Sequence, residues 1–349
     1  MAAASYGDVT VVVDEQDDLF YTRAALEAHC PAEGRITVHP TPASSSPAAL
    51  AHDLLYALGK RLAPGPGSPD VWLDSVAAAW LAAAAWAQAT GVRHVVVPRA
   101  HLLTLQRIDR LLAWRAATGV QLTLLWQRTA KKLPPALSQV ERRLSGQGQF
   151  MALLAEPGPM PARPSFPPVS LMPPKPDPKA VVFAGQSSVR LPQDARSTST
   201  AADRQARPCA GAMATAHLSH AAPAVHVAPE NAAILSALAH PLIAGALSVL
   251  AFTRVSLGSL RSTRDLDIIG DVSVIKIHAT THRSCTVYAV PDWARPLLAA
   301  ARAHHRLEGH PSGSGVLAPV MRSAAQHLRA HAERILWLEL TVAANVLVS

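Results

Sequence analysis

Near the N-terminus, the residues whose types could do chemistry are four carboxylates within five positions. An apolar run, Val9–Val13, leads directly into the acidic segment Asp14-Glu15-Gln16-Asp17-Asp18. Clustered carboxylates could hold a divalent cation, but the segment lacks the ligand spacing of an EF-hand loop. Aspartate in front of a helix also caps it, because the carboxylate accepts backbone N–H bonds and complements the positive end of the helix dipole. We interpret the segment as a helix cap, with a metal site as the weaker alternative.

The end of this apolar run is also where a nucleotide-binding α/β domain would place a phosphate-binding loop. Such a loop needs glycines, whose backbone amides cradle the phosphates, and a lysine that reaches the outer phosphate oxygens. Phe20 and Tyr21 occupy the glycine and lysine positions, and Thr22 alone matches the hydroxyl residue. The carboxylates would also repel phosphate. We therefore expect no cofactor at this degenerate P-loop position.

A second apolar run, His94–Val97, leads into Pro98 and Arg99. In a P-loop ATPase the corresponding strand ends in an Asp-Glu pair, which holds Mg²⁺ and positions the attacking water. A proline and a cation can do neither. The sequence therefore argues against nucleotide hydrolysis at this strand end.

The C-terminal third carries residue types that act in phosphodiester chemistry on DNA. Two arginines can clamp a phosphate through bidentate contacts, a lysine and a histidine can move protons, and a tyrosine can attack phosphorus. The candidates for the arginine, lysine and histidine roles are Arg254, Lys276, His331 and Arg334. The last tyrosine is Tyr288, in a segment that favours a packed strand. Because no nucleophile follows, we interpret the four candidates as vestigial; a surface arginine and a strand-edge lysine are the alternatives for the first two.

The formal net charge of the 349-residue chain is +8, from 32 Lys and Arg against 24 Asp and Glu. A basic balance favours an acidic partner, with nucleic acid as the first candidate and an ordinary basic surface as the alternative. Binding through phosphates would have little sequence preference. The candidate DNA contacts are Arg254, Arg261, Arg264, Arg322 and Arg329.

The three cysteines, Cys30, Cys209 and Cys285, are far apart and form no metal-binding spacing, which favours a reduced cytoplasmic protein without a metal. No basic region followed by an apolar run opens the sequence. The apolar stretches Ala232–Phe252 and Ile335–Val348 are interrupted or short, so we interpret both as buried helices and expect no membrane partner. The abundance of alanine, arginine and proline indicates a high-GC bacterial genome.

The first 150 residues alternate between strand-like and helix-like runs. Strands are predicted at Val9–Val13, Arg35–His39, Val92–Val97 and Gln121–Trp126, and helices at Thr22–His29, Pro47–Leu62, Val71–Gln88 and Leu102–Thr118. Alternation at this spacing predicts an α/β domain, a doubly wound parallel sheet with helices on both faces. Ligands of such sheets bind beyond the carboxyl ends of the strands.

Over about residues 7–145, the order of these elements resembles the AAA+ ATPases of the transposition-helper type. The resemblance rests on the strand at Val9, the helix end Leu54–Gly59, the segment Val92–Leu103, and Thr118–Trp126, which in that family carries the sensor strand and here continues into Gln127. It implies an ATPase-like fold and a recombinase or transposase as partner. The replaced lysine and Asp-Glu pair set this chain apart from the active members.

Two further regions follow. Residues 151–228 are rich in proline, serine and alanine and predict a disordered linker. Residues 229–349 predict a mainly α domain with a small antiparallel sheet. Its first apolar stretch, Asn231–Phe252, should divide into two helices or kink at Pro241. Strands are expected at Val272–His278 and Thr286–Val290, with a helix after Pro291.

Over about residues 229–310, the chain resembles the catalytic domain of the tyrosine recombinase or phage integrase family, in truncated form. In that family an arginine after an apolar helix contacts the scissile phosphate, a D-x-D pair follows, and a hairpin lysine assists. The matching residues are Arg254, Val255, Ser256, Asp265, Asp267, Lys276, Val290 and Pro291. Thr253 and Leu257 replace a glycine and a glutamate of the family pattern.

Three hypotheses remain open from the sequence. The first is a non-catalytic DNA-binding or recombination-accessory protein of a mobile element. The second is an active tyrosine recombinase, with its nucleophile supplied by a partner subunit or by a longer reading frame. The third is a scaffold or helper protein that contacts another protein and no nucleic acid.

Overall fold

The computed structural model describes residues 9–42, 44, 46–62, 73, 75–140, 142–155, 222, 224–278, 285–311 and 313–317. Of the predicted linker, residues 151–228, the structure describes only 151–155, 222 and 224–228. Outside the described part lie His331 and Arg334, two of the vestigial catalytic candidates, and Arg322 and Arg329, two of the DNA-contact candidates. In the part of the chain that the structure describes, no helix is both long and apolar enough to cross a membrane.

The N-terminal half is an α/β domain with a five-stranded, all-parallel sheet. The strands are β1 (Val9–Val13), β2 (Arg35–Thr37), β3 (His94–Val97), β4 (Gln121–Trp126) and β5 (Arg142–Leu144), in the order β2-β3-β4-β1-β5. β1 therefore lies between β4 and β5. The fold class expected from the sequence is confirmed, and β5 adds an edge strand that was not predicted.

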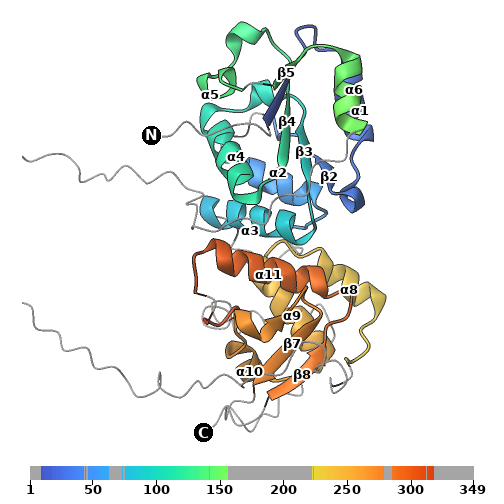
Figure 1. Cartoon of the computed structure of the whole chain (residues 1–349), viewed down its shortest axis with the longest axis vertical. Helices are drawn as coiled ribbons and strands as arrows, with labels where there is room; N and C mark the ends of the chain where they lie inside the picture. The colour runs from blue at the N-terminus through green and yellow to red at the C-terminus, as the bar shows by residue number, and fades with distance from the viewer. Residues whose placement is uncertain are drawn as a thin grey trace, which may run out of the picture.

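Helices cover both faces of this sheet (Figure 1). They are α1 (Leu19–Glu27), α2 (Ala49–Ala57), α3 (Val76–Ala89), α4 (Leu105–Thr118), the short α5 (Pro135–Ser138) and α6 (Gln147–Ala155). Side chains alternate along each strand, as a strand repeat of two requires. Val11 and Leu124 belong to the core under α2, α3 and α4, whereas Val12 and Leu125 pack with α1 and α6.

The C-terminal half is mainly helical. Its helices are α8 (Pro229–Ser236), α9 (Pro241–Thr253), α10 (Leu257–Arg261) and α11 (Arg295–Leu307), and its antiparallel sheet contains β6 (Ile268–Ile269), β7 (Val274–His278) and β8 (Cys285–Ala289). The predicted break at Pro241 is confirmed, because this residue opens α9. β6 was not predicted; it is only two residues long.

Several predicted boundaries were wrong by a few residues, and each has a local cause. The helix expected from Leu102 begins at Leu105, because Ala100–Leu102 forms a separate 3-10 turn and Thr104 caps α4. The helix expected from Thr22 begins at Leu19, because Asp18 is its N-cap. The linker was expected from residue 151, but α6 continues to Ala155, with Leu153 and Leu154 buried.

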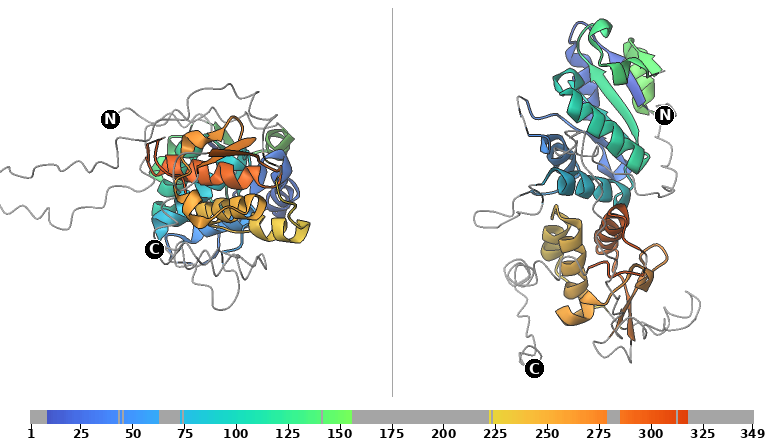
Figure 2. Two further views of the ribbon diagram at one scale, coloured as in Figure 1. Left: turned by 90° about the horizontal axis from the view of Figure 1, so that it is seen from below. Right: turned by 90° about the vertical axis from the view of Figure 1, so that its left-hand side faces the viewer.

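One apolar core runs through both halves, and α3 is at its centre. Six consecutive residues of this helix, Ala82 to Ala87, are buried, which is more than one full helical turn. α3 packs against α2 and α4 on one side and against α9 and α11 on the other (Figures 1 and 2). Alanine suits this position because its small side chain allows helices to approach closely on every side.

Polar contacts also tie the two halves together. The Lys60 ammonium lies 3.3 Å from the centre of the Trp86 ring and donates to the Ser236 carbonyl oxygen at 2.6 Å. The Trp86 indole N–H donates to the Ala239 carbonyl oxygen at 2.7 Å. Arg61 N–H donates to the Ala237 carbonyl oxygen at 2.6 Å. The end of α2 and the end of α8 are thus joined through backbone oxygens that α8 itself leaves unused.

The close approach of α9 and α11 yields the first prediction. A Cβ on Gly245 would lie 2.6 Å from Ala301 Cβ, so Gly245→Ala should destabilise the fold by about 1–3 kcal/mol through overpacking. The double variant Gly245→Ala/Ala301→Gly should recover much of this loss. Gly148→Ala in α6, where nothing lies within 4 Å, is the matched control and should stabilise by about 0.5–1 kcal/mol. Urea unfolding measures all three, and equal effects at positions 245 and 148 would contradict the proposed packing.

The second prediction concerns Lys60, whose pKa burial lowers from 10.5 to about 8. Between these two values the unfolded chain holds more protons than the folded one, so folding stability should rise with pH. Relative to Lys60→Met, the wild type should gain up to about 3 kcal/mol between pH 8 and 10.5. Urea unfolding of both proteins across this range measures the difference, in which other titrating groups cancel. Parallel curves would show that Lys60 is not buried in this way.

Candidate functional site

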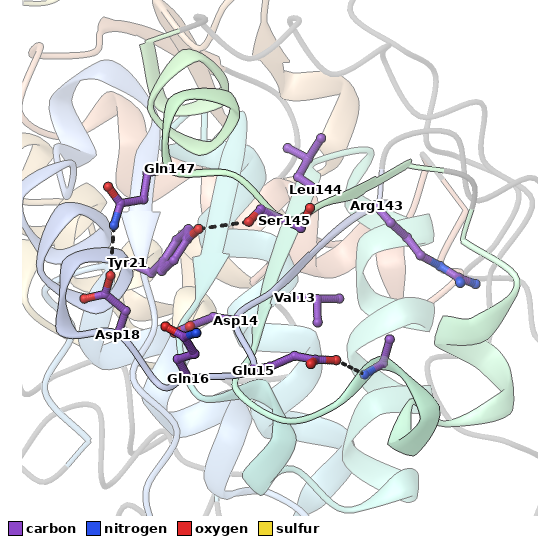
Figure 3. Close-up of a pocket in the computed structure, with 11 residues that line it drawn as sticks. Val13, Asp14, Glu15, Gln16, Asp18, Tyr21, Arg143, Leu144, Ser145 and Gln147 are labelled. Atoms are coloured by element: carbon purple, nitrogen blue, oxygen red, sulfur yellow. Dashed lines mark hydrogen bonds between the residues drawn. The ribbon is translucent and has the colours of Figure 1, made fainter.

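The carboxyl ends of the parallel strands form the candidate site, at the end of the molecule away from α11 (Figure 1). A pocket with a cavity volume of about 580 Å³ lies there, beside the ends of β1 and β5. The residues that line it come from the end of β1 and the acidic segment after it, the start of α1, the turn after β4, and β5 with its connection to α6: Val13, Asp14, Glu15, Gln16, Asp18, Tyr21, Ala130, Arg143, Leu144, Ser145 and Gln147 (Figure 3).

The start of α1 is closed by its own side chains. Asp18 is the N-cap, and its Oδ1 accepts the Phe20 N–H at 2.9 Å. Gln147 donates from Nε2 to Asp18 Oδ2 at 2.8 Å, and the Tyr21 hydroxyl donates to the Ser145 carbonyl oxygen at 3.3 Å. The interpretation of the acidic segment as a helix cap is confirmed. Because a carboxylate occupies the position that phosphate would need, the helix end is a poor anion site.

Tyr21 and Thr22 are accounted for by contacts inside the fold. The Tyr21 ring is buried against Phe150 of α6, with ring centres 5.4 Å apart. Thr22 accepts a hydrogen bond from Gln127 Nε2 at 3.2 Å, and Gln127 directly follows β4. The Gln127 Oε1 atom is buried and has no hydrogen-bond partner. Two of the residues that the sequence aligned with a P-loop are thus occupied by contacts within the fold.

Asp14 is the most constrained carboxylate of the pocket. It is 5% exposed, and its N–H extends the β1–β4 ladder by donating to the Trp126 carbonyl oxygen at 3.0 Å. Burial raises the pKa of Asp14, and the charges of Asp18 and Asp17 raise it further, against backbone hydrogen bonds that lower it. Its Oδ2 atom is buried and has no hydrogen-bond partner.

The end of β3 carries a positive charge, where the corresponding strand of an ATPase ends in an Asp-Glu pair. Pro98 is buried, and Arg99 adopts a left-handed conformation with φ of 54°, which is uncommon for a residue other than glycine. Next to it, burial lowers the pKa of His101, and the positive charges of Arg128 and Arg99 add to this effect. A cation at this strand end would meet positive charge. Among the described residues, no group of three or more His, Cys, Asp or Glu side chains could hold a metal ion.

The described residues that the sequence matched to a recombinase or to DNA contacts lie on α9, α10, β7 and the turn before β6. Arg254 caps the end of α9 with a left-handed φ of 57° and is exposed, and Arg261 is exposed at the end of α10. Lys276 is half-buried on β7, which packs against α10. Arg264 donates from Nε to Asp267 Oδ2 at 3.4 Å and is therefore partly neutralised.

The D-x-D pair is an internal anchor. Asp265, which is 1% exposed, accepts from Arg302 Nε at 2.6 Å and from Arg306 Nη2 at 2.9 Å, both on α11. Asp267 contacts Arg264 and lies 3.0 Å from His278 Nε2 on β7. These contacts fasten the turn before β6 to α11 and β7. The arginines on α11 were not singled out from the sequence, although their spacing of four residues places them on one helix face.

The wall of the pocket opposite the acidic segment was not predicted from the sequence. Its residues Arg143, Ser145 and Gln147 come from β5 and the start of α6, and no hydrophobic pattern indicated these two elements. Comparisons with protein-family models, with curated proteins and with solved structures find no match for this chain. Its function therefore has to be argued from its own residues.

The cap at Asp18 gives the third prediction. Asp18→Ala removes the acceptor for the Phe20 N–H and the partner of Gln147, and should destabilise the fold by about 1 kcal/mol. Asp18→Asn keeps an oxygen for the Phe20 N–H and should lose less. Urea unfolding of the two variants measures the difference. If alanine and asparagine behaved alike, the hydrogen bonds at the start of α1 would not be what stabilises it.

Proposed function

We propose that this chain is a non-catalytic DNA-binding or recombination-accessory protein, with an ATPase-like sheet that does not hydrolyse nucleotide. The observation that carries this proposal is the strand order β5-β1-β4-β3-β2, with a capped acidic loop after β1 and Pro98-Arg99 after β3. The arrangement keeps the two strand ends beside β4 that an ATPase uses. Both lack the groups that would hold phosphate and Mg²⁺.

The charge distribution supports DNA as the partner. The chain is basic overall, and Arg254 and Arg261 are exposed near each end of α10. Among the described residues, neither arginine has an ion-pair partner. α10 lies at the end of the molecule away from the five-stranded sheet (Figure 1), where a duplex could approach without meeting the acidic pocket. Contacts of this kind read the backbone rather than the bases.

The same geometry favours binding over strand cleavage. Three arginines of this half are not available to clamp a phosphate, because Arg264 is held by Asp267, and Arg302 and Arg306 are held by Asp265. Tyr288 lies on β8 and pairs with Ile275 of β7 in the sheet register. A tyrosine in mid-strand is poorly placed to move toward phosphorus.

A mobility shift with duplex DNA across a salt series tests this proposal. Affinity should fall steeply with salt, and Arg254→Gly and Arg261→Ala should each weaken binding and flatten the log–log slope by about 0.9. Arg254→Gly separates binding from folding, because glycine adopts the left-handed conformation without strain and should stabilise the fold by about 1 kcal/mol. Lost binding could then not be attributed to unfolding.

Arg23→Ala is the control, because Arg23 is an exposed arginine of α1 that pairs with Glu27. Its binding curve should match that of the wild type. Binding that did not weaken with salt, or that all three variants left unchanged, would overturn the DNA-binding proposal. Nicking of the duplex by the purified chain would favour the recombinase hypothesis, and a parallel titration with Mg-ATP should give no binding signal.

A further inference from the structure

The pocket beside β1 and β5 is lined by more carboxylates than cations. Three of its lining residues are carboxylates, Asp14, Glu15 and Asp18, and Asp17 lies in the same segment. Arg143 is the one Lys or Arg among the lining residues. Its guanidinium donates to the Ser138 carbonyl oxygen, and Figure 3 shows it directed away from Asp14. The Arg143 guanidinium is therefore directed toward Ser138 rather than toward Asp14.

Two buried groups, the Tyr21 hydroxyl and the Asp14 carboxylate, are affected by the neighbouring negative charges. Burial raises the pKa of the Tyr21 hydroxyl, and the charges of Asp14 and Asp18 raise it further. Asp14 is 5% exposed and lines the cavity, yet its Oδ2 has no hydrogen-bond partner. A buried carboxylate oxygen without a partner costs free energy unless something outside the described chain satisfies it. A donor that carries positive charge would satisfy both the oxygen and the field.

The dimensions of the pocket and its hydrogen-bond acceptors select among cations. A cavity of about 580 Å³ falls in the range of sites for small organic ligands and is far larger than a single ion needs. No described group of three or more His, Cys, Asp or Glu side chains could hold a metal ion. Guanidinium and ammonium groups carry several N–H donors, which several separated carboxylates can share.

We propose that this pocket binds an organic cation bearing a guanidinium or ammonium group, with Asp14, Glu15 and Asp18 as its carboxylate partners. Asp14 forms the closed end of the site, and the exposed Glu15 forms its rim. The cationic group could belong to a free small molecule or to an arginine or lysine side chain of a peptide. The shared chemistry is the same in both cases. The inference is independent of DNA binding, because Arg254 and Arg261 lie at the opposite end of the molecule.

Calorimetric titration of the full chain with agmatine, which carries both a guanidinium and an ammonium group, tests this site. Saturable binding is expected, and Asp14→Asn and Glu15→Gln should each weaken it about tenfold or more, because each removes a charged hydrogen-bond partner. Glu15→Gln keeps an oxygen for the Ala130 N–H that Glu15 accepts at 3.2 Å, so it should fold normally. Circular dichroism verifies the fold of both variants.

Glu27→Gln is the matched control, since Glu27 is an exposed acid of α1 whose partner is Arg23 and which does not line the pocket. Its agmatine affinity should equal that of the wild type. The proposal is overturned if agmatine gives no saturable signal up to about 10 mM, well above the affinity expected of a built site. Unchanged affinity in both pocket variants, or displacement of agmatine by stoichiometric Mg²⁺, would overturn it equally.

A second arm distinguishes the source of the cation. A short arginine-containing peptide with blocked ends, titrated beside agmatine, should compete with it for the pocket. Tighter binding of the peptide, lost in Glu15→Gln, assigns the site to a basic protein segment. Tighter binding of agmatine assigns it to a small molecule. Either result supports a cation site.

Discussion

The rest of the structure depends on the burial of the middle of α3, Ala82 to Ala87, over its whole circumference. A helix that is apolar on every side has no stable exposed state, so it must be covered on both sides at once. The sheet with α2 and α4 covers one side, and α9 and α11 cover the other. The two halves of the chain are therefore bound by the same apolar area that stabilises each of them. Trp86, which is fully buried and hydrogen-bonded to the Ala239 carbonyl oxygen, extends this constraint to the end of α8.

This shared core orients the two candidate interaction surfaces. Because α3 lies between the halves, the carboxyl edge of the sheet is directed to one end of the molecule and α10 to the other (Figure 1). The first end carries the pocket and its carboxylates, and the second presents Arg254 and Arg261. A single chain can thus offer two interaction surfaces, since exposed charges that far apart are screened from each other in salt.

Elements that are determined locally could be predicted from the sequence. The strands Val9–Val13 and Gln121–Trp126 were predicted residue for residue, because an uninterrupted apolar run between turn residues has few alternatives as a buried parallel strand. Pro241 likewise fixed a helix start. In contrast, β5 is a three-residue strand containing Arg142 and Arg143, and it exists because it pairs with β1. A strand of that kind has no periodicity to detect, and the far wall of the pocket was missed with it.

The candidate site was predictable in part, for the same reason. The cap at Asp18 follows from local chemistry and was predicted, whereas Arg143, Ser145 and Gln147 reach the pocket because β5 pairs with β1, far away in the sequence. Conversely, the residues matched to a recombinase included Asp265 and Asp267, whose role depends on partners that the pattern does not specify.

Those partners decide how the basic charge of the C-terminal half is used. Asp265 holds Arg302 and Arg306 at distances of 2.6 and 2.9 Å, so two of the cations are consumed in fastening α11. Without these two arginines, the buried Asp265 carboxylate would be an unpaired charge and would destabilise the fold. Arg302 and Arg306 therefore cannot leave Asp265 to clamp a phosphate without a loss of stability. The exposed Arg254 and Arg261 form no ion pair with the described residues. Positive charge that is needed for folding and positive charge that is exposed to a partner are therefore carried by different arginines in this half of the chain.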